Sequence, residues 1–317
     1  MSTAEPWTVG RLLQWTADYL KGHGSESPRL DAEVLLAHVL GRQRIELYTA
    51  FDEAPDEAAR AAFRELVRRR AEGMPVAYLV GHREFYSLSF QVTPAVLVPR
   101  PETELLVVAV LDLAKTYSPL PQAGEGSGVR AEGSAPSPET APPLAIVDIG
   151  TGSGAIAVSL AKHLPMSRLL AIDRSPAALA VAARNAQQHG VAERIEFVES
   201  DLMAAVPAEW RFDFIVSNPP YVTTAEMESL AADVRKFEPR EALVAGPRGT
   251  EVIERLVVQA GKRLRPGGHL LIEISPTIHD AVRALLESDA RFEPGPTIKD
   301  LARLPRVVQA RRKGDGN

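Results

Sequence analysis

The sequence predicts an α/β protein in which a parallel sheet, covered by helices on both faces, follows a small helical domain. From Leu144 onward, short apolar runs alternate with segments of helical length, as expected for repeated strand–helix–strand units. Before Pro75 the apolar residues recur instead at the spacing of one helical face. The 317 residues suffice for two domains and at least one sizeable core.

The N-terminal region, from residue 8 to about 75, is predicted to be a small helical bundle. Apolar residues recur at helical spacing from Val9 to Leu20 and from Ala32 to Leu40, and Asp31 is a possible N-cap of the second helix. A third helix is expected from Asp56 to Glu72.

A hairpin and an insertion are expected between these helices and the sheet. From Phe85 to Val98 the apolar residues stand among polar and turn residues, which predicts a short hairpin. Pro101 then suits the first turn of a helix, and Glu102 suits its positive end. Residues 118–143 are mostly Pro, Gly, Ser and Ala, so burial cannot offset their ordering entropy and we predict a flexible surface insertion. The expected domains are helical (1–78), hairpin linker (79–104) and sheet domain (105–317).

The sheet domain is predicted to contain strands at Leu144–Ile149, Leu169–Ile172, Ile195–Glu199, Phe212–Ser217 and His269–Ile274. Helices are expected between them, for example at Ala155–His163 and Pro176–His189. The turn Arg265-Pro266-Gly267-Gly268 is expected to stop a helix before the fifth strand. The segment Arg306–Ala310 is predicted to be a last strand on or near an edge.

Composition and charge exclude several classes of protein. A net charge of -5 argues against a protein that coats duplex nucleic acid through a broad basic face. The absence of cysteine excludes disulfides and thiolate chemistry, and the seven histidines show no metal-ligand spacing, so no metal is expected. The N-terminus has no secretory signal pattern, and the longest apolar stretch, Leu105–Leu113, is too short to span a bilayer. We expect a cytoplasmic protein, a monomer by default, that binds neither membrane nor nucleic acid directly.

The most informative motif is Asn218-Pro219-Pro220-Tyr221 at the end of a predicted buried strand. Each Pro fixes its own φ and pushes the preceding residue toward extended geometry, so Asn218 is held open to a ligand. The Asn218 side-chain oxygen and a backbone carbonyl, expected to be that of Pro219, can accept both N–H bonds of a planar –NH2 group. Tyr221 would then cover the plane of that group. In isolation the motif is also compatible with an ordinary loop.

A glycine-rich turn upstream predicts a cofactor site. The first strand of the sheet leads into Asp148-Ile149-Gly150-Thr151-Gly152-Ser153-Gly154, where glycines allow a tight turn and close approach of a ligand. The second strand ends at Asp173, which can accept hydrogen bonds from ribose hydroxyls, and the third leads to Asp201 and Leu202, which would border an adenine ring.

The spacing of the turn distinguishes two cofactor classes. Nicotinamide and flavin folds use G-x-G-x-x-G and bind a pyrophosphate, whereas this turn is G-x-G-x-G with Asp148 beside it. S-adenosylmethionine carries a sulfonium and an ammonium, so an acid there is favourable, and we expect this methyl donor. A donor pocket beside an –NH2 site predicts methylation of a carboxamide or an adenine amine, mainly through placement in line with the S–CH3 bond.

The chain resembles the class I S-adenosylmethionine-dependent enzymes that methylate the glutamine side-chain amide of peptide chain release factors. The resemblance covers nearly the whole chain and depends on the segments Arg83–Val92, Val98–Glu104, Asp148–Gly154, Ser217–Tyr221, Phe237–Leu243, Lys299–Leu301 and Arg306–Val308. The first departure is the insertion. The second is Ser275-Pro276 after Glu273, where the family usually continues Gly-x-x-Gln.

The resemblance implies a Rossmann-like, seven-stranded catalytic sheet with a helical N-terminal domain. It implies that the methyl donor lies on Gly150–Gly154, Asp173, Leu202 and Asn218. The acceptor glutamine, in a Gly-Gly-Gln loop of the release factor, would bind at Asn218, Pro219, Pro220 and Tyr221. Arg100 and Glu102 either contact the substrate or only fix the linker hairpin.

Three alternatives stay open at the level of sequence. An adenine-N6 methyltransferase of DNA or RNA shares the Asn-Pro-Pro-Tyr motif, although the acidic balance disfavours it. A methyltransferase that modifies a ribosomal-protein glutamine would need the same site. A non-catalytic module that keeps only the donor pocket would not need Asn218.

Overall fold

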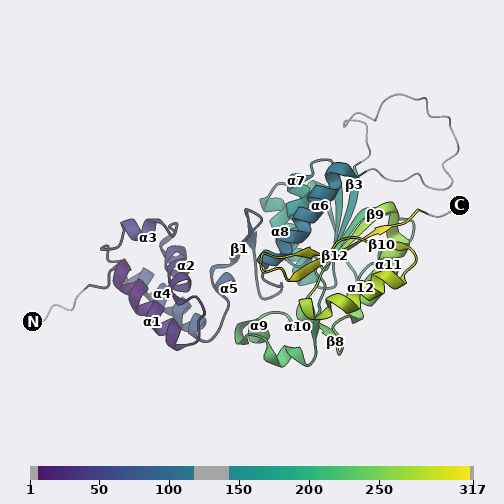
Figure 1. Ribbon diagram of the computed structural model, residues 1–317. Coiled ribbons are helices and arrows are strands. Elements are labelled where there is room, and N and C mark those ends of the chain that lie inside the picture. Colours follow the sequence, from purple (N-terminus) through teal and green to yellow (C-terminus); the bar gives the residue numbers. More distant parts are fainter. Residues whose placement is uncertain (1–5, 118–142, 315–317) are drawn as a thin grey trace, which may run out of the picture. The chain divides into compact units, whose positions relative to one another are not determined.

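The computed structural model describes residues 6–117 and 143–314, which fall into two compact units (Figure 1). The first unit is formed by residues 1–82, 92–94 and 230–238, and the second by the rest of the chain. The expected insertion lies outside the described residues except for its last position, 143. Within the described ranges, no helix is long and apolar enough to cross a membrane.

The first unit is helical. Its helices are α1 (Val9–Gly22), α2 (Pro28–Leu40), α3 (Glu46–Thr49), α4 (Glu57–Ala71), α5 (Val76–Val80) and α9 (Ala232–Phe237). Leu13, Leu35 and Phe63 are buried in its core, as the helical spacing of apolar residues predicts, and Leu47 of α3 is buried with them. The short helices α3 and α5 were not expected, because four or five residues carry too little periodicity to be recognised.

The start of α2 differs from the prediction. The helix begins at Pro28 after the N-cap position Ser27, and not at Asp31. Proline is favoured at this first position because its missing N–H would be unpaired there in any case. Asp31 instead accepts hydrogen bonds from Ser25 Oγ and from Arg70 Nε of α4, each at 2.7 Å. The acid therefore ties two helices together instead of capping one.

The second unit contains a mixed sheet between two layers of helices. After the hairpin β1 (His82–Phe85) and β2 (Leu88–Gln91) come the turn η1 (Pro101–Thr103) and the helix α6 (Glu104–Thr116). The sheet strands are β3 (Leu144–Ile149), β4 (Ser167–Asp173), β5 (Ile195–Glu199), β6 (Phe212–Ser217), β9 (Leu264–Glu273), β10 (Phe292–Pro294), β11 (Ile298–Lys299) and β12 (Pro305–Arg312). The main helices between them are α7 (Ala155–His163), α8 (Pro176–Gln188), α11 (Glu251–Arg263) and α12 (His279–Ser288).

The remaining elements of this unit are short. They are η2 (Ala192–Arg194), β7 (Val222–Thr223), η3 (Glu226–Ser229), α10 (Arg240–Leu243), β8 (Val244–Gly246) and η4 (Pro276–Ile278). The strands β7 and β8 pair with each other outside the main sheet. The departure Ser275-Pro276 forms η4, with Ser275 Oγ accepting from the N–H of Thr277, so the chain turns directly into α12.

Seven sheet strands lie in the order β10-β12-β9-β6-β3-β4-β5, and β11 pairs with β12 beside this path. The five strands from β9 to β5 are parallel, whereas β12 is antiparallel to β9 and β10. This is the fold of class I S-adenosylmethionine-dependent methyltransferases. The last strand was predicted on or near an edge and lies one strand away from it.

Alternate side chains of the sheet enter two separate cores. On one face Val147, Ile172 and Ile215 pack with residues of α11 and α12. On the other face Ile146 and Phe214 pack with residues of α6 and α7. Because successive side chains of a strand point to opposite faces, a strand covered on both sides is buried throughout, as β6 is, although it includes Asp213 and Ser217.

One predicted boundary is wrong. The turn Arg265–Gly268 does not stop a helix before the strand, because β9 already begins at Leu264 and pairs with Phe212. The register then shifts, and the next pair is Phe214 with His269. The strand absorbs the four-residue turn as an irregularity, so its Pro and Gly residues resemble a break in the sequence although the pairing continues.

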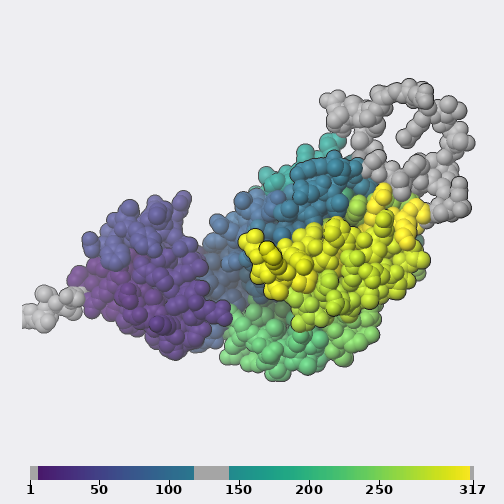
Figure 2. All heavy atoms as spheres, viewed as in Figure 1, coloured from purple at the N-terminus to yellow at the C-terminus, as the bar shows by residue number. Residues whose placement is uncertain are grey.

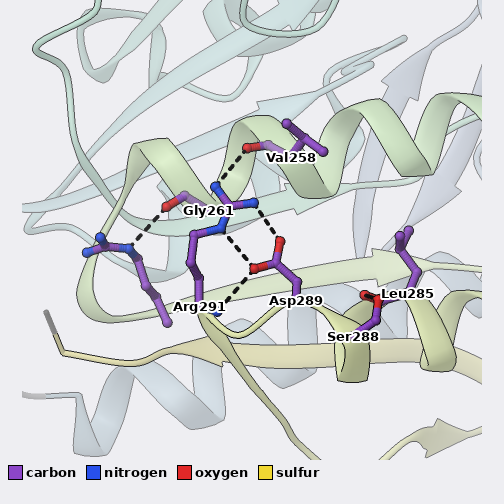
Figure 3. A network of polar contacts seen from close by, with 7 residues as sticks. Val258, Gly261, Leu285, Ser288, Asp289 and Arg291 are labelled. Atoms are coloured by element: carbon purple, nitrogen blue, oxygen red, sulfur yellow. Dashed lines mark hydrogen bonds and ion pairs between the residues drawn. The ribbon is translucent and has the colours of Figure 1, made fainter. Parts of the chain in front are cut away.

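The C-terminal strands are attached to α11 by arginines (Figure 3). Arg291 pairs with Asp289 at 2.5 Å and donates to the carbonyl of Val258, while Arg312 donates to the carbonyl of Gly261 at 3.1 Å. Gly261 is among the last four residues of α11, whose carbonyls have no partner within the helix, so the Arg312 cation satisfies one of them. In the space-filling view the last strands, in yellow, lie directly against the yellow-green residues that precede them in the sequence (Figure 2).

Candidate active site

The candidate site lies at the carboxyl ends of the parallel strands. After β3 the chain continues to β4 and β5 on one side of it and later enters β6 on its other side. The direction of the sheet order therefore changes at β3, and open α/β sheets bind ligands at such a topological switch point. Ile149 of β3 pairs with Ile172 of β4 and with Ser217 of β6. The turn after β3 therefore lies between Asp173 and Asn218, the residues that follow those two partners.

The glycine turn has the backbone geometry that its sequence predicts. Gly150, Gly152 and Gly154 have φ values of +74°, +55° and +80°, in the left-handed region that favours glycine. A Cβ on Gly154 would lie 3.0 Å from the Cβ of Ala182, so the turn also lets α7 start close against α8. These glycines shape the turn and leave its backbone open to a ligand.

Asp173 is fixed by the turn that it faces. Its Oδ2 accepts from the N–H of Gly152 at 2.9 Å, and its Oδ1 accepts from the N–H of Ser175 at 3.0 Å. A carboxylate oxygen has a second lone pair, so each oxygen keeps capacity for another donor. The carboxylate is therefore preorganised to accept hydrogen bonds from a diol such as a ribose.

A cavity of about 320 Å³ opens along these strand ends. Eight residues of the predicted site line it, namely Gly150, Gly152, Asp173, Asp201, Leu202, Asn218, Pro219 and Pro220. Thr151, Ser153, Gly154, Tyr221, Asp148, Arg100 and Glu102 do not line it. The structure thus brings the two sequence motifs, the glycine turn and Asn-Pro-Pro, to one cavity.

Asp148 lies beneath the turn and not in the cavity. It is fully buried, and its Oδ2 accepts from Thr151 Oγ1 at 2.7 Å and from the N–H of Ala157 at 3.1 Å. Burial raises its pKa to about 7, against the effect of these two hydrogen bonds. The acid expected to act on the donor directly therefore ties the turn to the first residues of α7.

Leu202, one of the two residues predicted to border an adenine, has a strained backbone. Leu202 lines the cavity with a φ of +51°, which is uncommon for a residue with a side chain. Its neighbour Asp201 forms an ion pair with Arg255 of α11 at 2.5 Å, and both carboxylate and guanidinium border the cavity. Backbone strain of this kind concentrates at ligand sites, where the surrounding fold maintains it.

Asn218 is oriented by a residue far away in sequence. Its Nδ2 donates to Thr103 Oγ1 at 3.1 Å, which directs the –NH2 toward η1. Gly150 lies close to the backbone of Asn218, since a Cβ there would be 3.9 Å from the Asn218 carbonyl oxygen. With the –NH2 engaged, the side-chain oxygen of Asn218 is the end of the amide that remains to accept a hydrogen bond.

Charged residues before α6 influence the pKa of Tyr221. Burial raises the pKa of Tyr221, the charge of Glu273 raises it further, and Arg100 opposes the shift. Glu102 also acts on this pKa, so Arg100 and Glu102 both lie near Tyr221. Glu104 instead accepts from the N–H of Tyr86 at 2.8 Å, a structural contact of the hairpin.

Two wall segments of the cavity were missed. The first is Ala95–Leu97, directly before the Val98–Glu104 motif, and the second runs from Pro239 to Ala245. The first segment carries no chemical signature of its own. The second overlaps the Phe237–Leu243 motif, which was recognised for the resemblance but was not assigned to the site. Among the described residues, no group of three or more His, Asp or Glu side chains could hold a metal ion.

Comparisons with known proteins show the family of the chain. A family model described as "PrmC N-terminal domain" matches residues 11–81, and one described as "Methyltransferase small domain" matches residues 139–237. A "Release factor glutamine methyltransferase" of Rhodopirellula baltica is 48% identical over 98% of this chain and 98% of its own. One with the same name from Geobacter sulfurreducens is 41% identical over 85% of each chain.

A solved structure supports the fold alone. The hMettl16 catalytic domain, in complex with an RNA hairpin, matches with a TM-score of 0.51 and 16% identity. The match covers 80% of this chain and 83% of that one.

Proposed function

The chain belongs to the release factor glutamine methyltransferase family, and we propose that Asn218 and the adjoining turn present a release-factor glutamine to S-adenosylmethionine bound along the glycine turn. The reaction is transfer of a methyl group to the side-chain amide nitrogen of the glutamine in the Gly-Gly-Gln motif of peptide chain release factors. The chain is an S-adenosylmethionine-dependent methyltransferase. The observation that carries the proposal is that Asn218, with its –NH2 directed to Thr103, borders the same cavity as the glycine turn and Asp173.

The residues of the cavity fit the methyl donor. Asp173 is preorganised to accept from the ribose hydroxyls, while Asp201 and Leu202 border the adenine. The glycine turn provides close backbone approach for the amino acid moiety, with Asp148 holding the turn from beneath. When bound, S-adenosylmethionine supplies a methyl group activated by its sulfonium.

The acceptor amide would be held by its –NH2. The Asn218 side-chain oxygen and the carbonyl of Pro219 accept its two N–H bonds, and the ring of Tyr221 covers its plane. These bonds stabilise positive charge that develops on nitrogen as its lone pair forms the new N–CH3 bond and the S–CH3 bond breaks. The nitrogen then releases one proton to solvent. No general base is required before the attack, so placement is the main contribution of the protein.

We also propose roles for the parts of the chain outside the cavity. Arg100 and Glu102, close to Tyr221, shape the entrance for the glutamine loop. We place the end of the helical domain near residue 78 and the end of the linker at residue 104. These two parts either dock onto the release factor or brace the fold. A monomeric state, a cytoplasmic location and the absence of direct nucleic-acid binding complete the proposal.

Incubation with labelled S-adenosylmethionine tests the function. Purified chain is mixed in parallel with a release factor, with a release factor whose Gly-Gly-Gln glutamine is replaced by alanine, with ribosomal proteins and with DNA. We expect label on the unmodified release factor only. Label on DNA or on ribosomal protein, without label on the factor, would reverse the assignment in favour of the corresponding alternative.

A further inference from the structure

We propose that Glu273 and Thr103 are positioning residues that fix which end of the Asn218 carboxamide faces the acceptor glutamine. The inference rests on the proposed function and adds a cause for the orientation of Asn218. Neither Glu273 nor Thr103 lines the cavity, so both act through Asn218 and not on the ligands.

The fold brings these side chains together from separate elements. Glu273 is the last residue of β9, and the preceding residue, Ile272, pairs with Ser217 of β6. Glu273 and Asn218 therefore occupy neighbouring strand ends. Thr103 comes from η1, and its Oγ1 accepts from Asn218 Nδ2 at 3.1 Å.

Glu273 is a buried acceptor with little choice of partners. Its exposed fraction is only 2%, and hydrogen bonding with the side chains of Thr103 and Tyr221 acts to lower its pKa. Its Oε2 has no hydrogen-bond partner among the described residues. Burial, together with the nearby charge of Glu102, raises its pKa to about 7.

Hydrogen-bond direction follows from the number of protons. A threonine hydroxyl has one proton, and an ionised carboxylate can only accept. Thr103 therefore gives its proton to Glu273, and its oxygen is left as an acceptor. Asn218 can meet that oxygen only with its –NH2, so its own oxygen is directed to the substrate side, where the –NH2 of a glutamine must be recognised.

A neutral group at position 273 would remove this constraint. A protonated Glu273, or a glutamine in its place, can donate to Thr103, which could then donate to the Asn218 oxygen. The Asn218 carboxamide would turn its –NH2 to the substrate –NH2, and two donors would face each other. The ionised form of Glu273 is thus the form that supports methyl transfer.

The charged groups around Glu273 come from each neighbouring element. Glu102 of η1 raises its pKa, while Arg306 of β12 and the hydrogen bonds from Thr103 and Tyr221 lower it. Arg306 is itself paired with Asp300 at 2.8 Å, which leaves part of its charge compensated. We expect kcat to rise with pH through a limb near 7 as Glu273 ionises.

Four variants of the full chain test the inference with a release factor as substrate. Glu273→Gln should lower kcat about ten- to hundredfold and abolish the limb near pH 7. If the limb arose from titration of Asp148 instead, it would remain in this variant. Thr103→Val should lower kcat by a similar factor, and Thr103→Ser, which keeps the hydroxyl, should be about tenfold more active than Thr103→Val. Glu293→Gln, at an exposed position of β10, should match the wild type. Calorimetric affinity for S-adenosylmethionine should stay within about threefold throughout.

The outcomes separate this inference from the proposed function. A wild type that methylates the factor, with Glu273→Gln showing the same kcat and pH profile, overturns the inference and leaves the function intact. Thr103→Val and Thr103→Ser of equal activity also overturn it, and this pair decides the matter if Glu273→Gln does not fold by thermal melting. A wild type that does not label the factor removes the function and the inference together.

Discussion

Asn218 Nδ2 and Thr103 Oγ1 are joined by a 3.1 Å hydrogen bond across 115 positions of the chain. Asn218 belongs to the motif that ends β6, and Thr103 belongs to the Pro-Arg-Pro-Glu-Thr-Glu segment that precedes α6. Two motifs that look independent in the sequence are therefore parts of one site. The second motif supports the amide-recognising side chain of the first, which explains in physical terms why the segment before α6 matters to the chemistry.

Replacement of Asn218 by alanine should separate catalysis from donor binding. Asn218→Ala removes a hydrogen-bond acceptor for the acceptor amide, so we expect kcat to fall about 10²- to 10³-fold. Donor affinity should be partly retained, because the glycine turn and Asp173 are unchanged. Single-turnover methylation of a release factor, with calorimetry for the donor, measures both quantities. Normal turnover in this variant would discredit the role assigned to Asn218.

Asp173 should control affinity for the methyl donor. Hydrogen bonds to a charged group contribute about 1.5–3 kcal/mol each, so Asp173→Ala should weaken donor binding about ten- to hundredfold. Asp112→Ala, at an exposed acid of α6 paired with Lys115, is the matched control and should bind normally. Equal dissociation constants for the two variants in calorimetry would mean that Asp173 does not contact the ribose.

Gly249 should be required for the position of Tyr221. Its φ is +78°, and a Cβ would lie 2.7 Å from the Tyr221 carbonyl oxygen. Gly249→Ala should therefore destabilise the fold by about 1–3 kcal/mol and lower methyl transfer. Gly190→Ala is the matched control, because Gly190 has a φ of +68° and no atom within 4 Å of the added Cβ. Denaturant melts and activity assays should show lost stability in both, but lost activity only in Gly249→Ala.

Asp148 should make stability depend on pH. Its pKa is about 7 in the folded chain, against an ordinary value of 3.8, so between these values the folded state holds a proton that the unfolded state has released. This contribution to stability is complete below about pH 4 and is lost as the pH rises to about 7. Relative to Asp148→Asn, the wild type should therefore lose stability over this window, by at most about 1.4 kcal/mol per pH unit. Urea unfolding of both proteins from pH 4 to 8 measures the difference, and a constant difference would contradict it.

The sequence was sufficient for the elements that depend on local pattern. Strands such as Phe212–Ser217 and Leu144–Ile149 are mostly apolar because both faces of the sheet are covered, and their ends were predicted to the residue. The glycine turn was also predictable, since three glycines at this spacing permit positive φ values. The fold class and the methyl donor could be predicted from these elements together with the resemblance.

Features that depend on tertiary contacts could not be predicted. The start of β9 at Leu264 was missed because pairing with β6 overrides the turn signal of Arg265–Gly268. The position of Asp148 beneath the turn, and not in the cavity, depends on bonds to Thr151 and Ala157 that spacing alone does not reveal. The position of Glu273 at the strand end next to Asn218 could not be predicted, because it depends on β9 and β6 being neighbours in the sheet.

Mass spectrometry of the methylated release factor can show which atom receives the methyl group. A release factor is incubated with the chain and S-adenosylmethionine, digested, and its Gly-Gly-Gln peptide is fragmented to place any added methyl group. We expect a single methyl on the side-chain amide nitrogen of that glutamine, and far less of it when Asn218→Ala replaces the wild type. A methyl on any other residue, or an unmodified peptide beside methylated adenine in added nucleic acid, would contradict it.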